Sequence, residues 1–137
     1  MIILSFNIRG FGGALKLLAL KELFSYNKPN VIFLQETMVE HLKAKEAFLK
    51  LCPSWFCVAV DSVGNSGGLL SGWNPKVGVF EASYLGVGIL LEGSVSCFTH
   101  SVSLLNVYGT YKDMLQFWQG AGDAGVLKTD SLILGGI

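Results

Sequence analysis

The sequence predicts an α+β fold in which β-sheets pack face to face and helices cover the outside. Two strand–helix patterns occupy residues 2–51, and short β-rich runs separated by glycines occupy residues 55–108. No repeat or linker interrupts the 137 residues, of which 51% are hydrophobic. We therefore expect residues 1–137 to belong to one domain, with no second domain.

The first strand–helix unit covers the first 30 residues. The apolar run Ile2–Ile8 predicts a buried strand, and the glycine-rich segment 9–13 predicts a turn. A helix should follow and end at Asn27–Asn30. Its predicted inward face consists of Leu15, Leu18, Ala19, Leu23 and Tyr26.

The second unit repeats this order. Val31–Leu34 is a short continuous apolar run, which is typical of a strand buried on both faces. Met38–Leu51 then shows helical spacing, and Pro53 lies just beyond it. Its predicted inward face consists of Leu42, Ala47, Phe48 and Leu51.

The rest of the chain is β-rich. We expect a meander of antiparallel strands, a short helix at Tyr111–Trp118 and a further strand at Ser131–Leu134. The strands of the meander are predicted at Trp55–Val60, Gly68–Trp73, Val77–Tyr84, Val87–Glu92 and Val102–Tyr108.

Composition excludes some functional classes. The mean hydropathy of +0.51 is high, yet no run reaches the roughly 20 apolar residues of a membrane-spanning helix. The start of the chain has no basic segment typical of a signal peptide. We expect an intracellular protein, in the nucleus if it acts on DNA, and not a secreted one. The charges of ten basic and ten acidic residues cancel, so any binding of nucleic acid must depend on local cations.

The three cysteines do not form a recognisable metal or disulfide pattern. Cys52, Cys57 and Cys97 are an odd set without a C-x-x-C pair. We expect all three to be buried thiols.

Three polar residues lie at predicted strand ends, where side chains leave the core. Asn7 ends the first strand, Glu36 follows the second, and Tyr108 ends the last full strand of the meander. A carboxylate directly after four buried apolar residues needs a positive partner, and Mg²⁺ with its preference for oxygen ligands would provide one. We expect the three side chains to converge at one edge of the sandwich.

Each of these residues also has a purely structural explanation. Asn7 suits a turn, Glu36 suits a helix N-terminus, and Tyr108 suits a half-buried strand. His41 and His100 lie among polar residues and are expected at the surface. No Ser-His-Asp or Cys-His grouping is supported.

A dinucleotide-binding βαβ unit is a second interpretation of the same segment. Gly10, Gly12 and Gly13 follow a strand and open a helix, and Glu36 closes the next strand. However, Leu15 stands where the G-x-G-x-x-G pattern needs glycine or alanine, and the β-rich remainder is not an alternating βα run.

Four segments together carry a more specific resemblance. They are Leu4–Gly13 (LSFNIRGFGG), Val31–Thr37 (VIFLQET), Asn65–Trp73 (NSGGLLSGW) and Asn106–Gly109 (NVYG). In this order and spacing they resemble the endonuclease/exonuclease/phosphatase (DNase I-like) superfamily. The resemblance is strongest to the N-terminal endonuclease domain of plant LINE-type non-LTR retrotransposons.

The resemblance implies a four-layer α/β/β/α sandwich and a Mg²⁺-dependent phosphodiesterase that nicks DNA. In that family Glu36 would hold the Mg²⁺, Asn7 would orient the metal or the phosphate, and Tyr108 would contact the scissile phosphate. DNA is the implied partner, and the oligomeric state is left open.

The sequence departs from the family pattern at its end. The family continues its paired glycines with Asp, Phe and Asn, whereas here Ile137 follows Gly136, and Thr110 replaces a proline. We therefore expect an N-terminal part of the domain, incomplete at the C-terminus, inactive alone and with weak or absent Mg²⁺ binding. A non-enzymatic interaction module that reuses the fold is the alternative.

Overall fold

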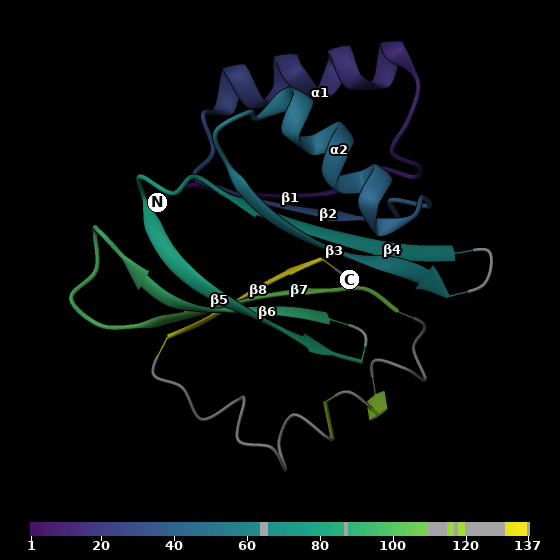
Figure 1. The fold of residues 1–137 in the computed structure, drawn as a ribbon. Coiled ribbons are helices and arrows are strands. Elements are labelled where there is room, and N and C mark those ends of the chain that lie inside the picture. Colours follow the sequence, from purple (N-terminus) through teal and green to yellow (C-terminus); the bar gives the residue numbers. More distant parts are fainter. Residues whose placement is uncertain (64–65, 87, 110–114, 117, 120–130, 137) are drawn as a thin grey trace.

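The computed structural model describes residues 1–137 except 64–65, 87, 110–114, 117, 120–130 and 137. Two four-stranded sheets stack face to face, and two helices cover the outer side of the first sheet (Figure 1). The first sheet and its helices comprise β1 (Ile3–Asn7), α1 (Ala14–Asn27), β2 (Val31–Gln35), α2 (His41–Leu51), β3 (Phe56–Val63) and β4 (Ser66–Trp73). The second sheet comprises β5 (Gly78–Leu85), β6 (Gly88–Val95), β7 (Val102–Val107) and β8 (Leu132–Gly136).

The β-rich part of the chain is divided between the two sheets. The first sheet has the order β1-β2-β4-β3, with β1 parallel to β2 and β4 antiparallel to it. The second has the order β5-β6-β7-β8. The prediction of one meander from Trp55 to Tyr108 is therefore wrong for its first two strands. They join the first sheet because β2 is buried on both faces and its second edge needs a hydrogen-bonding partner.

Strand β2 lies at the centre of the fold, as its continuous apolar run predicts. All five of its residues are buried. Ile32 and Leu34 pack towards the helices, whereas Val31 and Phe33 pack against the second sheet. Strand β1 is instead an edge strand whose last three residues are exposed, so the prediction of a buried first strand is wrong.

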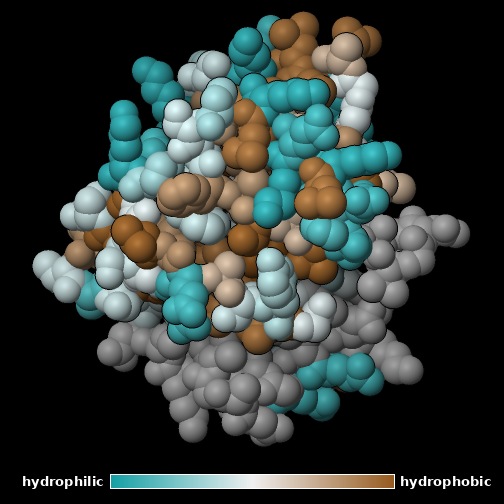
Figure 2. Space-filling view, in the orientation of Figure 1, coloured by the Kyte–Doolittle hydropathy of each residue, from teal (hydrophilic) through white to brown (hydrophobic). Residues whose placement is uncertain are grey.

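Helix α1 rests on the sheet through a different face from the one predicted. Leu20 and Phe24 are buried, whereas Leu15 is 85%, Leu18 54% and Tyr26 87% exposed. Apolar residues occur around much of this helix, so their spacing could not select the inward face. Figure 2 shows the resulting apolar side chains at the helical end of the molecule.

Helix α2 begins three residues later than predicted, because Met38 has a left-handed backbone (φ 55°) that a helix cannot continue. Ala44 and Phe48 are buried, but Leu42 is 61% exposed and does not belong to the inward face. A Cβ on Gly72 of β4 would overlap the Phe48 ring. Glycine at this position therefore lets the helix approach the sheet closely.

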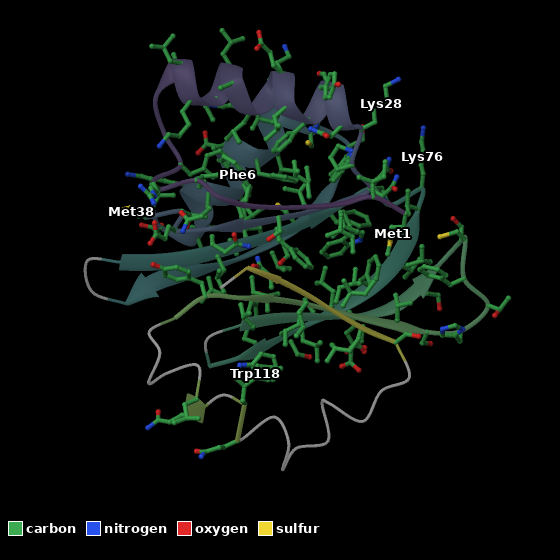
Figure 3. All side chains as sticks on the ribbon, turned by 180° about the vertical axis from the view of Figure 1, so that it is seen from behind. Met1, Phe6, Lys28, Met38, Lys76 and Trp118 are labelled. Carbon is green, nitrogen blue, oxygen red and sulfur yellow. The ribbon has the colours of Figure 1, made fainter. Side chains whose placement is uncertain are left out.

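The expected fourth layer falls largely outside the described residues. Of the helix predicted at Tyr111–Trp118, residues 115, 116 and 118 are described and are helical. They lie on the outer side of the second sheet, where Trp118 is labelled in Figure 3.

The cysteines match the prediction only in part. Cys52 is buried, Cys57 is intermediate and Cys97 is exposed, and all three are free thiols. Burial, reinforced by the nearby Cys57, raises the pKa of Cys52 to about 11. Cys52 therefore behaves as a core residue, whereas Cys97 contradicts the expectation of three buried thiols.

No helix in the described part of the chain is both long and apolar enough to cross a membrane.

The start of α2 is held by a side chain from β3. Asp61 Oδ1 accepts the backbone N–H of His41 at 2.6 Å and lies 2.8 Å from Nδ1 of the same residue. Both contacts lower the pKa of Asp61, and the backbone hydrogen bond has the larger effect. Asp61 therefore supplies the helix cap that the local sequence lacks.

We expect Asp61→Asn to make the stability of the fold less dependent on pH in the acidic range. The folded-state pKa is lowered, so the ionised carboxylate stabilises the fold above about pH 4, and this stabilisation is lost as pH falls through the folded-state pKa. Both side chains are exposed, so the difference should be small. Melting temperatures measured from pH 6 to pH 3 should differ between the two proteins at pH 6, and the difference should narrow as the pH falls towards 3. A constant difference would contradict this role.

Candidate functional site

The strand ends bring the three predicted site residues together. Asn7 is paired with Gln35, so β1 and β2 end at the same level, and Glu36 follows directly. Tyr108 follows β7 in the other sheet, and its hydroxyl donates a hydrogen bond to Glu36 Oε1. The predicted convergence at one edge of the sandwich is therefore confirmed, and the edge is the one where β8 ends in Figure 1.

Two buried amides join the sheets just beneath this edge. Gln35 Nε2 donates to Asn106 Oδ1 at 2.8 Å and to Ser5 Oγ at 3.1 Å. Asn106 Nδ2 in turn donates to the Leu70 carbonyl at 3.0 Å and lies 3.2 Å from Ser71 Oγ. Because both amides are almost fully buried, these hydrogen bonds fix the distance and alignment between the sheets at the site.

The sequence pattern did not identify Gln35 and Asn106 as residues that hold the site together. Gln35 directly precedes Glu36, and Asn106 lies two residues before Tyr108. Each is a polar residue in an apolar strand. A polar side chain in such a position needs a buried partner. This requirement could have identified both residues from the sequence. The sequence does not show, however, that each amide is the other's partner.

Strand β8 closes the site from the second sheet. It runs parallel to β7, with Asn106 opposite Gly135 and Val107 opposite Gly136. A Cβ on Gly136 would overlap the Val107 carbonyl, and one on Gly135 would meet the Phe33 ring. The paired glycines therefore allow β8 to lie close to the first sheet. A pocket of about 490 Å³ remains, lined by Ser5, Asn7, Gln35, Tyr108, Gly109 and Gly136.

The loops that follow β1 and β2 have unusual backbone conformations. Arg9 (φ 48°), Glu36 (φ 52°) and Met38 (φ 55°) are left-handed, which is uncommon for residues other than glycine. A 2.7 Å hydrogen bond from the Gly10 N–H to the Glu36 carbonyl joins the two loops. Such conformations concentrate at functional sites, where the surrounding structure maintains them.

Lys16 holds the turn after β1 in place. Its ammonium donates to the carbonyls of Ile8, Arg9 and Gly10 at 3.0, 3.1 and 2.9 Å. Three donors therefore meet three acceptors, and the ammonium satisfies turn carbonyls that lie outside any regular element. Lys16 is not among the residues of the inward face that the helical spacing predicts, and nothing in the sequence indicated this role.

The Tyr108 phenol is held in its protonated form. Its pKa is raised, first by the hydrogen bond to Glu36, then by burial and by the negative charge of Glu36, while the charge of Arg9 opposes the shift. Tyr108 is therefore a hydrogen-bond donor at neutral pH. The second oxygen of the neighbouring Glu36 carboxylate has no hydrogen-bond partner among the described residues.

The side chains at this edge offer a hard, all-oxygen set of ligands. Glu36 is a carboxylate, Asn7 carries an amide oxygen, and among the described residues no thiol or imidazole lines the pocket. This set fits Mg²⁺, which binds through one or two carboxylates and retains several waters. Within the described residues, no group of three or more His, Cys, Asp or Glu side chains is placed to hold a metal.

Two structural alternatives from the sequence are not supported. Glu36 does not act as a helix N-terminal carboxylate, because α2 begins five residues later, at His41. The dinucleotide-binding interpretation requires a doubly wound parallel sheet, but here β4 pairs antiparallel with β2, and β3 pairs antiparallel with β4. His41 and His100 are exposed or nearly so, as expected.

The fold matches that of several solved structures. The chain is similar to TDP2 from C. elegans, with a TM-score of 0.66 and 18% identity over 96% of this chain and 45% of that one. It is similar to the 3′ phosphatase NExo from Neisseria bound to a product DNA hairpin (TM-score 0.63, 18% identity, 96% and 55% coverage). It is also similar to the human Nocturnin catalytic domain with a bound sulfate (TM-score 0.64, 11% identity, 96% and 61% coverage).

The two sheets with their helices therefore form a DNase I-like sandwich, as the sequence predicts. The chain spans about half the length of these solved structures. No protein-family model and no curated protein sequence matches it.

Proposed function

We propose that this chain is the N-terminal part of a single Mg²⁺-dependent phosphodiesterase domain that nicks DNA. The observation that carries the proposal is the contact between Tyr108 and Glu36 across the two sheets, with Asn7 at the same edge. A phenol donor, a carboxylate and an amide at the open end of a nuclease fold are among the groups that a metal-assisted phosphodiester hydrolase uses.

Each residue has a separate role in this proposal. Glu36 would hold Mg²⁺, and Asn7 would orient the metal or the phosphate through its amide. The metal would neutralise negative charge on the phosphate when it is bound. Tyr108, which stays protonated, would donate a hydrogen bond to a phosphate oxygen. Gln35 and Asn106 would act indirectly, by keeping Glu36 opposite Tyr108.

The narrower proposal is an endonuclease of a plant LINE-type retroelement. The four sequence segments that resemble that family support it, and all four adjoin the site. The strand β1 and its turn supply Asn7, β2 supplies Glu36, β4 pairs with β2, and β7 leads to Tyr108. DNA as the partner and an intracellular, nuclear location belong to this proposal.

The described residues supply only part of a catalytic centre. At this edge they provide one carboxylate, that of Glu36, and no histidine, and hence no further group to act as a general base on a water. One carboxylate also competes poorly with the hydration shell of Mg²⁺. We therefore propose that the 137-residue chain binds Mg²⁺ weakly and does not nick DNA by itself. A DNA-binding module that does not cleave is the second candidate, favoured by the same observation.

We expect Glu36→Ala to abolish the weak metal binding while nicking is absent from both proteins. A missing general base alone corresponds to about 10²–10⁴-fold in rate. Binding of Mn²⁺, as a paramagnetic substitute for Mg²⁺, would be measured by water-proton relaxation, and nicking on supercoiled plasmid. Glu40→Ala removes an exposed carboxylate at the start of α2 and serves as the control.

The outcomes separate the parts of the proposal. Mn²⁺ binding that Glu36→Ala and Glu40→Ala reduce equally would contradict the metal site. Metal-dependent nicking that disappears in Glu36→Ala would support the site and contradict the expected inactivity.

A further inference from the structure

Arg9 is fixed in position by contacts to its backbone. Its N–H donates to Asn7 Oδ1 at 3.2 Å, and its carbonyl accepts from Lys16 Nζ at 3.1 Å. The next residue, Gly10, is bound to the Glu36 carbonyl. The left-handed conformation of Arg9 is unfavourable for a residue with a Cβ, and these contacts maintain it.

The side chain of Arg9 is available to a ligand. It is exposed, and within the part of the chain that the structure describes its guanidinium has no hydrogen bond or ion pair. Lys16, the other cation of this turn, has its three donors engaged by carbonyls. The charge of Arg9 also lowers the pKa of Tyr108 against the effect of Glu36, so the guanidinium lies near enough to act electrostatically on the site.

We propose that Arg9 binds a backbone phosphate of the DNA strand, next to the phosphate held at Tyr108 and Asn7. A guanidinium presents a planar set of donors that matches phosphate oxygens in pairs, and a fixed backbone reduces the entropy lost on binding. The chain has no net charge, so a local cation beside the site is needed to attract the strand. This inference rests on the proposed function.

The experiment measures the binding of a fluorescein-labelled 20-base-pair DNA duplex by anisotropy, from 50 to 200 mM salt. Arg9→Gly removes the guanidinium and also relieves the left-handed conformation, so loss of binding would not reflect strain in the turn. Arg9→Lys keeps the charge without the paired donors. Lys76→Ala removes an exposed cation far from Met38 and the site loops (Figure 3) and is the matched control.

We expect Arg9→Gly to lower the affinity about tenfold at low salt and to reduce the slope of log K against log salt by about 0.9, the value for one lost phosphate contact. Arg9→Lys should keep the slope and lose part of the affinity, and Lys76→Ala should match the wild type. Binding that Arg9→Gly reduces no more than Lys76→Ala does would overturn this inference and leave the proposed function standing. No measurable DNA binding by the wild-type chain would overturn both.

Discussion

Asn106→Leu is expected to destabilise the fold by about 2–4 kcal/mol, although the leucine side chain has the same branched shape as that of asparagine. The substitution leaves the Gln35 amide with only Ser5 as a partner and removes both donors to Leu70 and Ser71. Each buried polar group that loses its partner costs about 1–3 kcal/mol. Urea denaturation followed by circular dichroism would measure the difference.

A double-mutant cycle tests the origin of this effect. Gln35→Met removes the opposing amide, so Asn106→Leu should cost less in that background than in the wild type. A cost that is the same in both backgrounds would mean that the two amides act independently. In that case the loss would come from packing of the new side chain and not from the hydrogen bond between the sheets.

Leu20→Ala should destabilise the fold by about 2–4 kcal/mol, whereas Leu18→Ala should change it by no more than about 0.5 kcal/mol. Leu20 is 3% exposed and packs in the core beneath α1, whereas Leu18 lies two residues away and is 54% exposed. The two variants make the same chemical change in the same helix. Helix propensity is therefore matched, and the difference reports burial alone.

A larger loss in Leu18→Ala than in Leu20→Ala would indicate that α1 is oriented as the apolar spacing in the sequence predicted. In that orientation Leu18 faces the sheet. The measurement is again the free energy of unfolding in urea, with the slope of the transition compared between variants to detect a change in the unfolded or folded state.

Sequence reasoning succeeded where one physical signal dominated. The run Val31–Leu34 has no polar residue, so burial on both faces followed directly. The placement of Asn7, Glu36 and Tyr108 at one edge followed from their positions at strand ends. In both cases the local pattern was sufficient, because strand direction and strand end determine where a side chain lies.

It failed where tertiary contacts decide between equivalent local choices. The apolar residues of α1 permit more than one inward face, and only the sheet beneath selects Leu20 and Phe24. The allocation of β3 and β4 to the first sheet depends on the free edge of β2, which no local pattern reports. The contacts of Lys16 depend on a turn whose shape exists only in the folded chain.

The amide pair between the sheets also determines which alignment of the sheets is allowed. Apolar faces attract without direction, so Phe33 would pack almost as well against a β7 strand displaced along its axis. A slip of β7 by one residue would turn Asn106 outward and place Leu105 or Val107 opposite Gln35, whose buried amide would then keep only Ser5 as a partner. The pair therefore excludes alternative stackings, and because Glu36 and Tyr108 follow these strands closely, the same selection decides that the two site residues face each other.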